Sequence, residues 1–174
     1  KAYGSDQSFR ICETAIQTLG GVGYTADYGI EQYCRDAKIF SIYEGTNHIQ
    51  AMDLVGRKLG MASGANLQAY LTDVQNFVTA HSEHPVIGAE VKLLGETTAA
   101  LQGTTMRLLS WFYGGQLDLV PLVANRFLEM MSENTIAWLL LDQAVLAGNE
   151  LTEVFGDHPD YSCFLGKRFS ERSV

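Results

Sequence analysis

Apolar residues recur at helical spacing along almost the whole chain, and no stretch alternates polar and apolar residues with a period of two. The first pattern places side chains on one face of an α-helix, whereas the second is typical of a half-buried strand. We therefore expect an all-α fold, a helical bundle followed by an additional bundle-like helical extension. With 174 residues, 47% of them hydrophobic, the chain is long enough to bury a core.

Three helices are expected in the first part of the chain. Ser5 is the expected N-cap of the first helix, and Gly20 and Gly21 end it, since glycine is common at helix C-termini. A connector without periodicity, residues 40–47, separates the second helix from the third. The expected helices cover residues 6–19, about 30–37 and about 49–59.

The small and polar stretch from Gly60 to Gly64 is the predicted internal boundary. It divides the chain into a bundle segment, residues 1–63, and a C-terminal helical extension, residues 64–174. The extension is expected to use longer helices joined by short connections. These helices cover about residues 67–78, 85–112 and 121–155, and a short tail helix follows Pro159.

Acidic residues outnumber basic ones, 20 to 12, and the net charge is −8. Phosphate contacts require clustered Lys and Arg, so this composition argues against a nucleic-acid partner. The cysteines, Cys12, Cys34 and Cys163, are odd in number and widely spaced, which favours neither a disulfide framework nor a zinc site. His81 and His84 have no cysteine nearby in the sequence, and Pro85 ends the helix that could place both imidazoles on one face, so no metal site is expected.

The most apolar stretch, residues 136–141, is interrupted by Asp142 and Gln143 and is far shorter than the roughly 20 residues that a membrane span requires. We expect a buried helix there and no membrane span. The chain begins with Lys1, and its opening segment has neither signal-peptide nor transit-peptide composition. Together with the cysteine usage, this favours a reducing, cytoplasmic setting and a chain that is a fragment of a longer protein.

The stretch from Gly21 to Ala26 formally fits the G-x-G-x-x-A dinucleotide fingerprint. That fingerprint requires a preceding strand, and here a predicted helix precedes it, so we reject a Rossmann site. A helix C-terminus followed by a turn explains the same residues. Glycine backbone can nevertheless approach a pyrophosphate closely and offer it N–H groups.

Three motifs occur in order within residues 17–50. They are a Gln-x-x-Gly-Gly-x-Gly-aromatic turn at residues 17–24, an Arg-Asp-Ala-Lys-Ile run at residues 35–39, and Tyr-Glu-Gly-Thr-Asn at residues 43–47. Together they resemble the C-terminal signature of acyl-CoA dehydrogenases. Residues 51–174 resemble the extra helical region of the longer members of that family.

The resemblance implies a role for each matching position of the third motif. Glu44 falls where most acyl-CoA dehydrogenases hold the general base, and its backbone N–H would bond the thioester carbonyl. Tyr43 would line the acyl pocket, and Gly45 would leave space for the thioester. Arg35 and Asp36 belong to the signature, and we expect structural ion pairing from them.

The resemblance also implies a bound FAD. Gln17, Gly20 and Gly21 match positions that touch the flavin nucleotide of a neighbouring subunit. Thr46 matches a flavin contact, and His48 stands where many relatives have Gln or Glu at a cofactor contact. The expected partners are therefore an acyl-CoA substrate, an electron-transferring flavoprotein and further copies of the chain, as a dimer or tetramer.

A physical argument for Glu44 stands beside the resemblance. Dehydrogenation of an acyl thioester removes a weakly acidic α-proton while hydride leaves the β-carbon for the flavin. A carboxylate can accept that proton if burial against the acyl chain and flavin raises its pKa. A carboxylate just before a helix is also favourable without any catalytic role, because it faces the positive end of the helix dipole.

Three functions stay open at this point. The first is an acyl-CoA dehydrogenase, of which the 174 residues alone would fold but neither hold FAD tightly nor turn over. The second is an acyl-CoA oxidase-like enzyme with oxygen as the electron acceptor. The third is a non-catalytic helical assembly module. For the extension, residues 64–174, we favour a role in oligomer packing.

Overall fold

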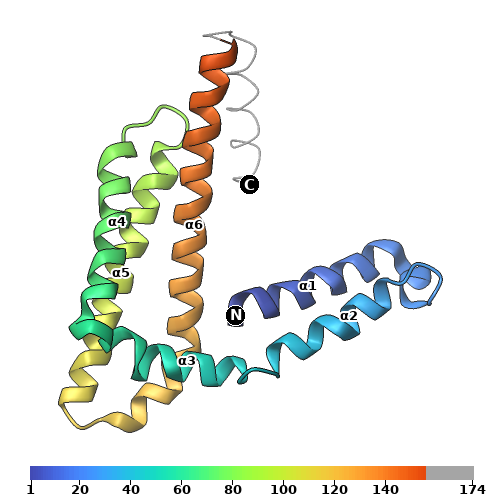
Figure 1. The fold of residues 1–174 in the computed structure, drawn as a ribbon, viewed down its shortest axis with the longest axis horizontal. Coiled ribbons are helices and arrows are strands. Elements are labelled where there is room, and N and C mark those ends of the chain that lie inside the picture. The colour runs from blue at the N-terminus through green and yellow to red at the C-terminus, as the bar shows by residue number, and fades with distance from the viewer. Residues whose placement is uncertain (156–174) are drawn as a thin grey trace. The chain divides into compact units, whose positions relative to one another are not determined.

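A computed structural model describes the backbone of residues 1–155 and the side chains of residues 1–149 (Figure 1). All regular elements among these residues are α- or 3-10 helices, and none is a strand. The predicted all-α fold is therefore confirmed. The tail helix expected after Pro159 and the thiol of Cys163 lie outside the described residues.

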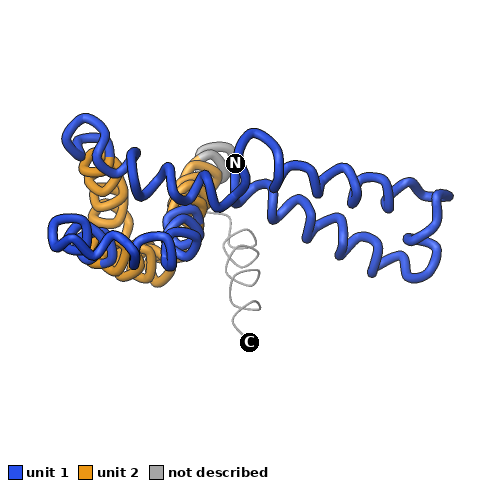
Figure 2. Tube along the Cα trace, turned by 90° about the horizontal axis from the view of Figure 1, so that it is seen from below, with its two compact units in different colours: residues 1–66, 104–132 blue, residues 67–103, 133–174 orange. Residues whose placement is uncertain are grey.

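The first two helices form a hairpin. Helix α1 runs over Ala2–Leu19 and α2 over Ile30–Lys38, and the short η1, Gly20–Tyr24, follows α1. The two helices lie side by side (Figures 1 and 2). Across them, the Lys38 ammonium lies 5.0 Å from the centre of the Phe9 ring. Gly20 ends α1 with a φ of +64°, a left-handed conformation that favours glycine.

The predicted start of the first helix is wrong. Ser5 does not cap the helix, because α1 already begins at Ala2 and Ser5 lies inside its first turns. The Ser5 hydroxyl is buried and donates a hydrogen bond of 2.8 Å to the main-chain oxygen of Ala2. A side-chain bond to the preceding turn replaces the capping role that serine often takes at a helix start.

A connector joins α2 to α3. It contains the single turn η2, Ile39–Ser41, and α3 follows over Asn47–Gly56. The short η3, Lys58–Gly64, then leads away from α3. These elements agree with the predicted connector and third helix to within a few residues.

Three longer helices make up the rest of the described chain. Helix α4 runs over Ala65–His81, α5 over Gly88–Tyr113 and α6 over Val120–Phe155, and η4, Leu117–Leu119, precedes α6. The predicted breaks at His84-Pro85 and Gly114-Gly115 separate them. None of the helices in the described residues is both long and apolar enough to cross a membrane.

The chain forms two compact units, which are coloured separately in Figure 2. Unit 1 contains residues 1–66 and 104–132, and unit 2 contains residues 67–103 and 133–174. The units interleave along the sequence because α5 and α6 each contribute one segment to either unit. The two units are defined by contacts between residues, and each combines two separate segments of the sequence. The predicted division of the sequence after residue 63 therefore stays a prediction.

Unit 2 has an apolar core built from α4, α5 and α6. The buried members are Val74, Phe77, Ile87, Val91, Leu94 and Val145. Beside it lies the buried Asn134, which is only 4% exposed. Its amide accepts hydrogen bonds from the hydroxyls of Thr97 and Thr98 at 2.9 and 3.2 Å and donates one of 2.9 Å to the Tyr70 hydroxyl. The polar groups of this core are thus partnered, which stabilises one register of the three helices.

Candidate active site

A tight turn lies at Glu44 and Gly45, in unit 1, between α2 and α3. The N–H groups of Ile42 and Tyr43 both donate to the main-chain oxygen of Ile39, which closes the turn after α2. Glu44 then has a φ of +54° and Gly45 a φ of +78°. A left-handed conformation costs a residue other than glycine about 1 kcal/mol or more, and such positions cluster at functional sites.

Side chains on both sides hold this turn in place. The amide of Gln50 donates a hydrogen bond of 2.9 Å to the main-chain oxygen of Glu44. The ammonium of Lys1 donates one of 2.9 Å to the oxygen of Gly45 and one of 3.0 Å to the Asn47 side chain. Both carbonyl groups of the turn are therefore bonded to side chains, one from α3 and one from Lys1, which precedes α1.

Asn47, the first residue of α3, is fixed to the first turns of α1. Its amide oxygen accepts a hydrogen bond of 3.1 Å from the Ser5 hydroxyl. Its amide nitrogen donates one of 2.8 Å to Asp6 and one of 3.4 Å to the main-chain oxygen of Ala2. Ser5 therefore helps to join the start of α1 to the helix that follows the candidate base.

Glu44 and Tyr43 lie at the edge of an open hollow of about 290 Å³. Glu44 is exposed among the described residues, and Tyr43 is 49% exposed. The Tyr43 and Phe40 rings lie with their centres 6.1 Å apart. Of the three consecutive residues predicted around the thioester, Tyr43 and Glu44 line this hollow, and Gly45 follows them directly in the turn without lining it. Its lining residues are Lys1, Gly4, Ser5, Phe40, Tyr43 and Glu44.

The predicted nucleotide contacts form a separate group. Gln17, Gly20 and Gly21 lie at the far end of α1 from the hollow and are exposed. The 13 residues from Gly4 to Gln17 span about 20 Å along a helix with a rise of about 1.5 Å per residue. A Cβ added at Gly20 or Gly21 would meet no atom within 4 Å, so the backbone here is open to an approaching group. The structure does not bring this group together with Glu44 within one chain.

Thr46 and His48 begin α3. The Thr46 hydroxyl caps the helix by accepting a hydrogen bond of 3.3 Å from the Ile49 N–H. That leaves its own O–H free to donate. The Nδ1 atom of His48 lies 3.0 Å from the amide oxygen of Asn125, in α6. Neither the Asn125 contact nor the Lys1 and Gln50 contacts were predicted, because only the folded chain brings these positions together.

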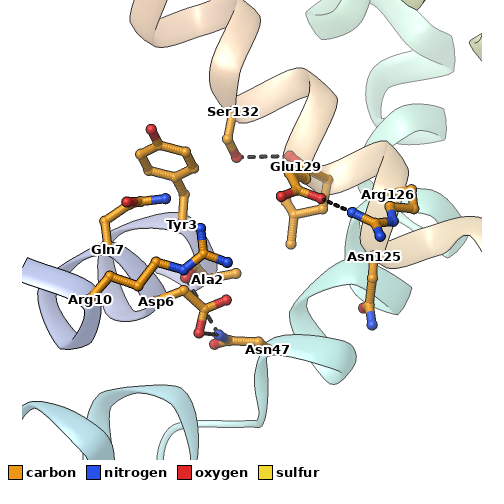
Figure 3. Close-up of a pocket in the computed structure, with 11 residues that line it drawn as sticks. Ala2, Tyr3, Asp6, Gln7, Arg10, Asn47, Asn125, Arg126, Glu129 and Ser132 are labelled. Atoms are coloured by element: carbon orange, nitrogen blue, oxygen red, sulfur yellow. Dashed lines mark hydrogen bonds and ion pairs between the residues drawn. The ribbon is translucent and has the colours of Figure 1, made fainter. Parts of the chain in front are cut away.

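Unit 1 has a second, polar hollow of about 270 Å³ (Figure 3). Its polar lining comes from α1 and α6, and the Asn47 side chain also lines it. Arg126 and Glu129 form an ion pair of 2.8 Å there. None of the residues predicted from the sequence to bind substrate or cofactor lines this hollow. Its polar lining includes Asp6, Gln7 and Arg10 of α1 and Asn125, Arg126 and Glu129 of α6.

Other singled-out residues have structural partners. Arg35 forms the expected ion pair, with Glu31 at 2.6 Å, whereas Asp36 forms none among the described residues. The His81 ring packs against Phe77 with centres 4.7 Å apart. The His84 Nδ1 accepts a hydrogen bond of 3.2 Å from the Val86 N–H. Across the described part of the chain, no three His, Cys, Asp or Glu residues gather closely enough to hold a metal ion.

Two family models match the chain. Residues 1–60 match the model described as "Acyl-CoA dehydrogenase, C-terminal domain", and residues 70–168 match "Acetyl-CoA dehydrogenase C-terminal like". The second match alone covers more than half of the sequence. The chain therefore belongs to the acyl-CoA dehydrogenase family, as the resemblance of its motifs predicted.

Curated relatives agree with this assignment. A butyryl-CoA dehydrogenase of Syntrophomonas wolfei is 35% identical over 167 residues, which is 96% of this chain and 27% of the relative. The broad-specificity linear acyl-CoA dehydrogenase FadE5 of Mycobacterium tuberculosis is 38% identical over 152 residues, 84% of this chain and 25% of the relative. The chain thus spans about a quarter of the length of these relatives.

Proposed function

We propose that the protein carrying this chain is an FAD-dependent dehydrogenase that introduces an α,β double bond into an acyl-CoA thioester, with Glu44 as the base that removes the α-proton. The observation that carries the proposal is the left-handed turn at Glu44. It is held by Gln50 and Lys1 beside a hollow lined by Tyr43. A strained position fixed by side chains on both sides is typical of a residue that must be held in one place.

The geometry of the turn supports a role for each of its residues. The carboxylate of Glu44 accepts the α-proton. Its backbone N–H has no hydrogen-bond partner within the described part of the chain, so it is free to donate to the thioester oxygen and stabilise the developing enolate. Tyr43 lines the acyl side of the hollow. Gly45 adds no side chain beside the reacting carbons.

The same residues that were predicted to hold FAD fit a flavin nucleotide chemically. When bound, the flavin supplies the acceptor for the hydride that leaves the β-carbon. Thr46 offers a hydroxyl donor, and His48 offers a ring nitrogen. Gln17, Gly20 and Gly21 offer an exposed amide and open backbone about 20 Å away along α1.

This distance supports an assembly of several chains. Gln17, Gly20 and Gly21 would serve the flavin bound by a neighbouring copy, in a homodimer or homotetramer. Exposed apolar side chains on the α1–α2 hairpin, among them Ile11 at 67% and Tyr33 at 65% exposure, suit a surface that another chain or domain covers. We further propose a cytoplasmic location and an electron-transferring flavoprotein as the electron acceptor.

The chain by itself is proposed to fold without holding FAD tightly or turning over. Glu44 is exposed in this chain. We propose that the larger part of the protein holds the acyl chain and the flavin, and that these two groups bury Glu44 in the intact enzyme. The two family matches lie on either side of residues 61–69, which supports the proposed division into residues 1–63 and 64–174.

The test is Glu44→Gln in the intact enzyme. We expect dehydrogenation of an acyl-CoA to fall by orders of magnitude while the flavin spectrum is retained, because the amide cannot accept the proton. Glu96→Gln, at an exposed position of α5, is the matched control and should retain activity. Equal activity of wild type and Glu44→Gln would contradict the proposal and favour a non-catalytic assembly module. Transfer of electrons to oxygen in preference to a flavoprotein acceptor would favour the oxidase-like alternative.

A further inference from the structure

His48 has one of its two ring nitrogens occupied by a residue far along the chain. Its Nδ1 atom lies 3.0 Å from the Oδ1 atom of Asn125, 77 positions away, and both residues belong to unit 1. His48 is the second residue of α3, and Asn125 lies near the start of α6. The contact therefore joins the helix that follows the Glu44 turn to the first part of α6.

This contact determines which nitrogen of the neutral imidazole carries the proton. An amide oxygen only accepts hydrogen bonds, so the Nδ1 atom that faces it must be the donor. A neutral imidazole has a single N–H group. The Nε2 atom of His48 is then an acceptor.

The Nε2 atom faces away from Asn125, because the two nitrogens of an imidazole point in diverging directions. His48 is exposed, and its Nε2 atom has no hydrogen-bond partner among the residues that the structure describes. It is available to a group outside this chain. That group must be a donor, such as a hydroxyl or an amine.

We propose that Asn125 is a positioning residue, which holds His48 in the Nδ1–H form so that Nε2 accepts a hydrogen bond from a hydroxyl or the exocyclic amine of the bound flavin nucleotide. The inference rests on the proposed function. A flavin nucleotide carries hydroxyls on its ribityl and ribose groups and an amine on its adenine. Its phosphate oxygens are acceptors, so a neutral His48 in this form does not bind them.

The first part of the test measures the tautomer in the 174-residue chain. Nitrogen-15 NMR at about pH 8 distinguishes the Nδ1–H from the Nε2–H form of a neutral imidazole, because the protonated and unprotonated ring nitrogens resonate far apart. We expect the Nδ1–H form in the wild type and in Asn125→Asp, whose carboxylate also accepts. Asn125→Leu should give a mixture of both forms. Asn76→Leu, an exposed asparagine of α4, is the control and should retain the wild-type spectrum.

The second part measures FAD affinity of the intact enzyme. Loss of one hydrogen bond to the nucleotide should weaken FAD binding in Asn125→Leu by roughly three- to tenfold. Asn125→Asp should restore most of that affinity, and Asn76→Leu should leave it unchanged. A merely structural contact between α3 and α6 would lower stability in Asn125→Leu without the rescue of FAD affinity by Asn125→Asp.

Two results would overturn the inference. One is an Nε2–H tautomer in the wild-type chain, a measurement that does not depend on whether Asn125→Leu folds. The other is unchanged FAD affinity in Asn125→Leu when its tautomer has shifted. These results are distinguishable from failure of the proposed function, which would appear as a wild-type enzyme without FAD or as full activity of Glu44→Gln.

Discussion

The side-chain amide of Gln50 donates a hydrogen bond of 2.9 Å to the main-chain oxygen of Glu44. Glu44 has a left-handed backbone with a φ of +54°, which is unfavourable for any residue other than glycine. The first turns of α3 thus stabilise, through Gln50, the conformation of the residue proposed as the base. The consequences of this relationship can be measured.

Replacing Gln50 by Leu removes the donor while keeping a side chain of similar size. We expect dehydrogenase activity of the intact enzyme to fall about tenfold, because a small displacement of a catalytic group lowers the rate strongly. The free energy of unfolding of the chain should fall by about 1 kcal/mol. Gln68→Leu, at an exposed position of α4, is the control and should change neither quantity appreciably. Wild-type rates in Gln50→Leu would show that this bond does not position Glu44.

Gly45→Ala tests the tightness of the turn. The φ of Gly45 is +78°, and a Cβ added there would lie 2.9 Å from the Nε2 atom of Gln50. We expect the free energy of unfolding to fall by about 1–3 kcal/mol, measured by urea denaturation. The matched variant is Gly21→Ala, where φ is not positive and no atom lies within 4 Å of the new carbon. It should leave stability nearly unchanged, and equal losses in the two variants would count against the proposed strain at Gly45.

Asn134→Ala tests the polar network in the core of unit 2. The substitution removes the amide that joins the hydroxyls of Thr97, Thr98 and Tyr70, in a position that is 4% exposed. We expect a loss of about 2–3 kcal/mol in the free energy of unfolding, because buried polar groups lose partners and a cavity forms. Asn76→Ala, at an exposed position of α4, should change stability by less than about 0.5 kcal/mol. A small effect of both variants would show that the network contributes little.

The Asp53–Arg57 pair predicts a pH dependence. The hydrogen bond from Arg57, at 2.6 Å, holds the pKa of Asp53 below its ordinary value of 3.8, and Lys58 lowers it further. A carboxyl group whose pKa is depressed in the folded state contributes stability above its unfolded pKa and loses that contribution as pH falls through the folded pKa. In carbon-13 NMR titrations, Arg57→Ala should raise the titration midpoint of Asp53, whereas Arg126→Ala should leave it unchanged. An unaltered midpoint in Arg57→Ala would contradict this assignment.

The helical architecture could be predicted from the sequence because the apolar stripes, glycines and prolines that define it are local signals. The start of α1 could not. Serine has a strong preference for the N-cap, worth about 1 kcal/mol. In the folded chain Ser5 instead bonds Ala2 and Asn47, so tertiary structure overrides a local preference.

The candidate base could be found from the sequence, but its supports could not. The Tyr43–Asn47 motif pointed to Glu44 through family resemblance, and the chemistry of α-proton removal is consistent with a carboxylate there. The groups that hold the turn come from elsewhere, since Lys1 is 44 positions from Gly45. The left-handed φ of Glu44 also could not be predicted from the sequence, because glutamate has no preference for that conformation. Only the folded chain places these residues together.

The central claim is that Glu44 takes the proton from the carbon next to the thioester. Exchange of that proton with deuterium from solvent, followed by mass spectrometry of the acyl-CoA, reports this step separately from electron transfer to an acceptor. Wild-type enzyme and Glu96→Gln should exchange the proton at similar rates, and Glu44→Gln should slow the exchange by at least about a hundredfold. Exchange at the wild-type rate in Glu44→Gln, with FAD bound, would contradict the assignment of Glu44 as the base.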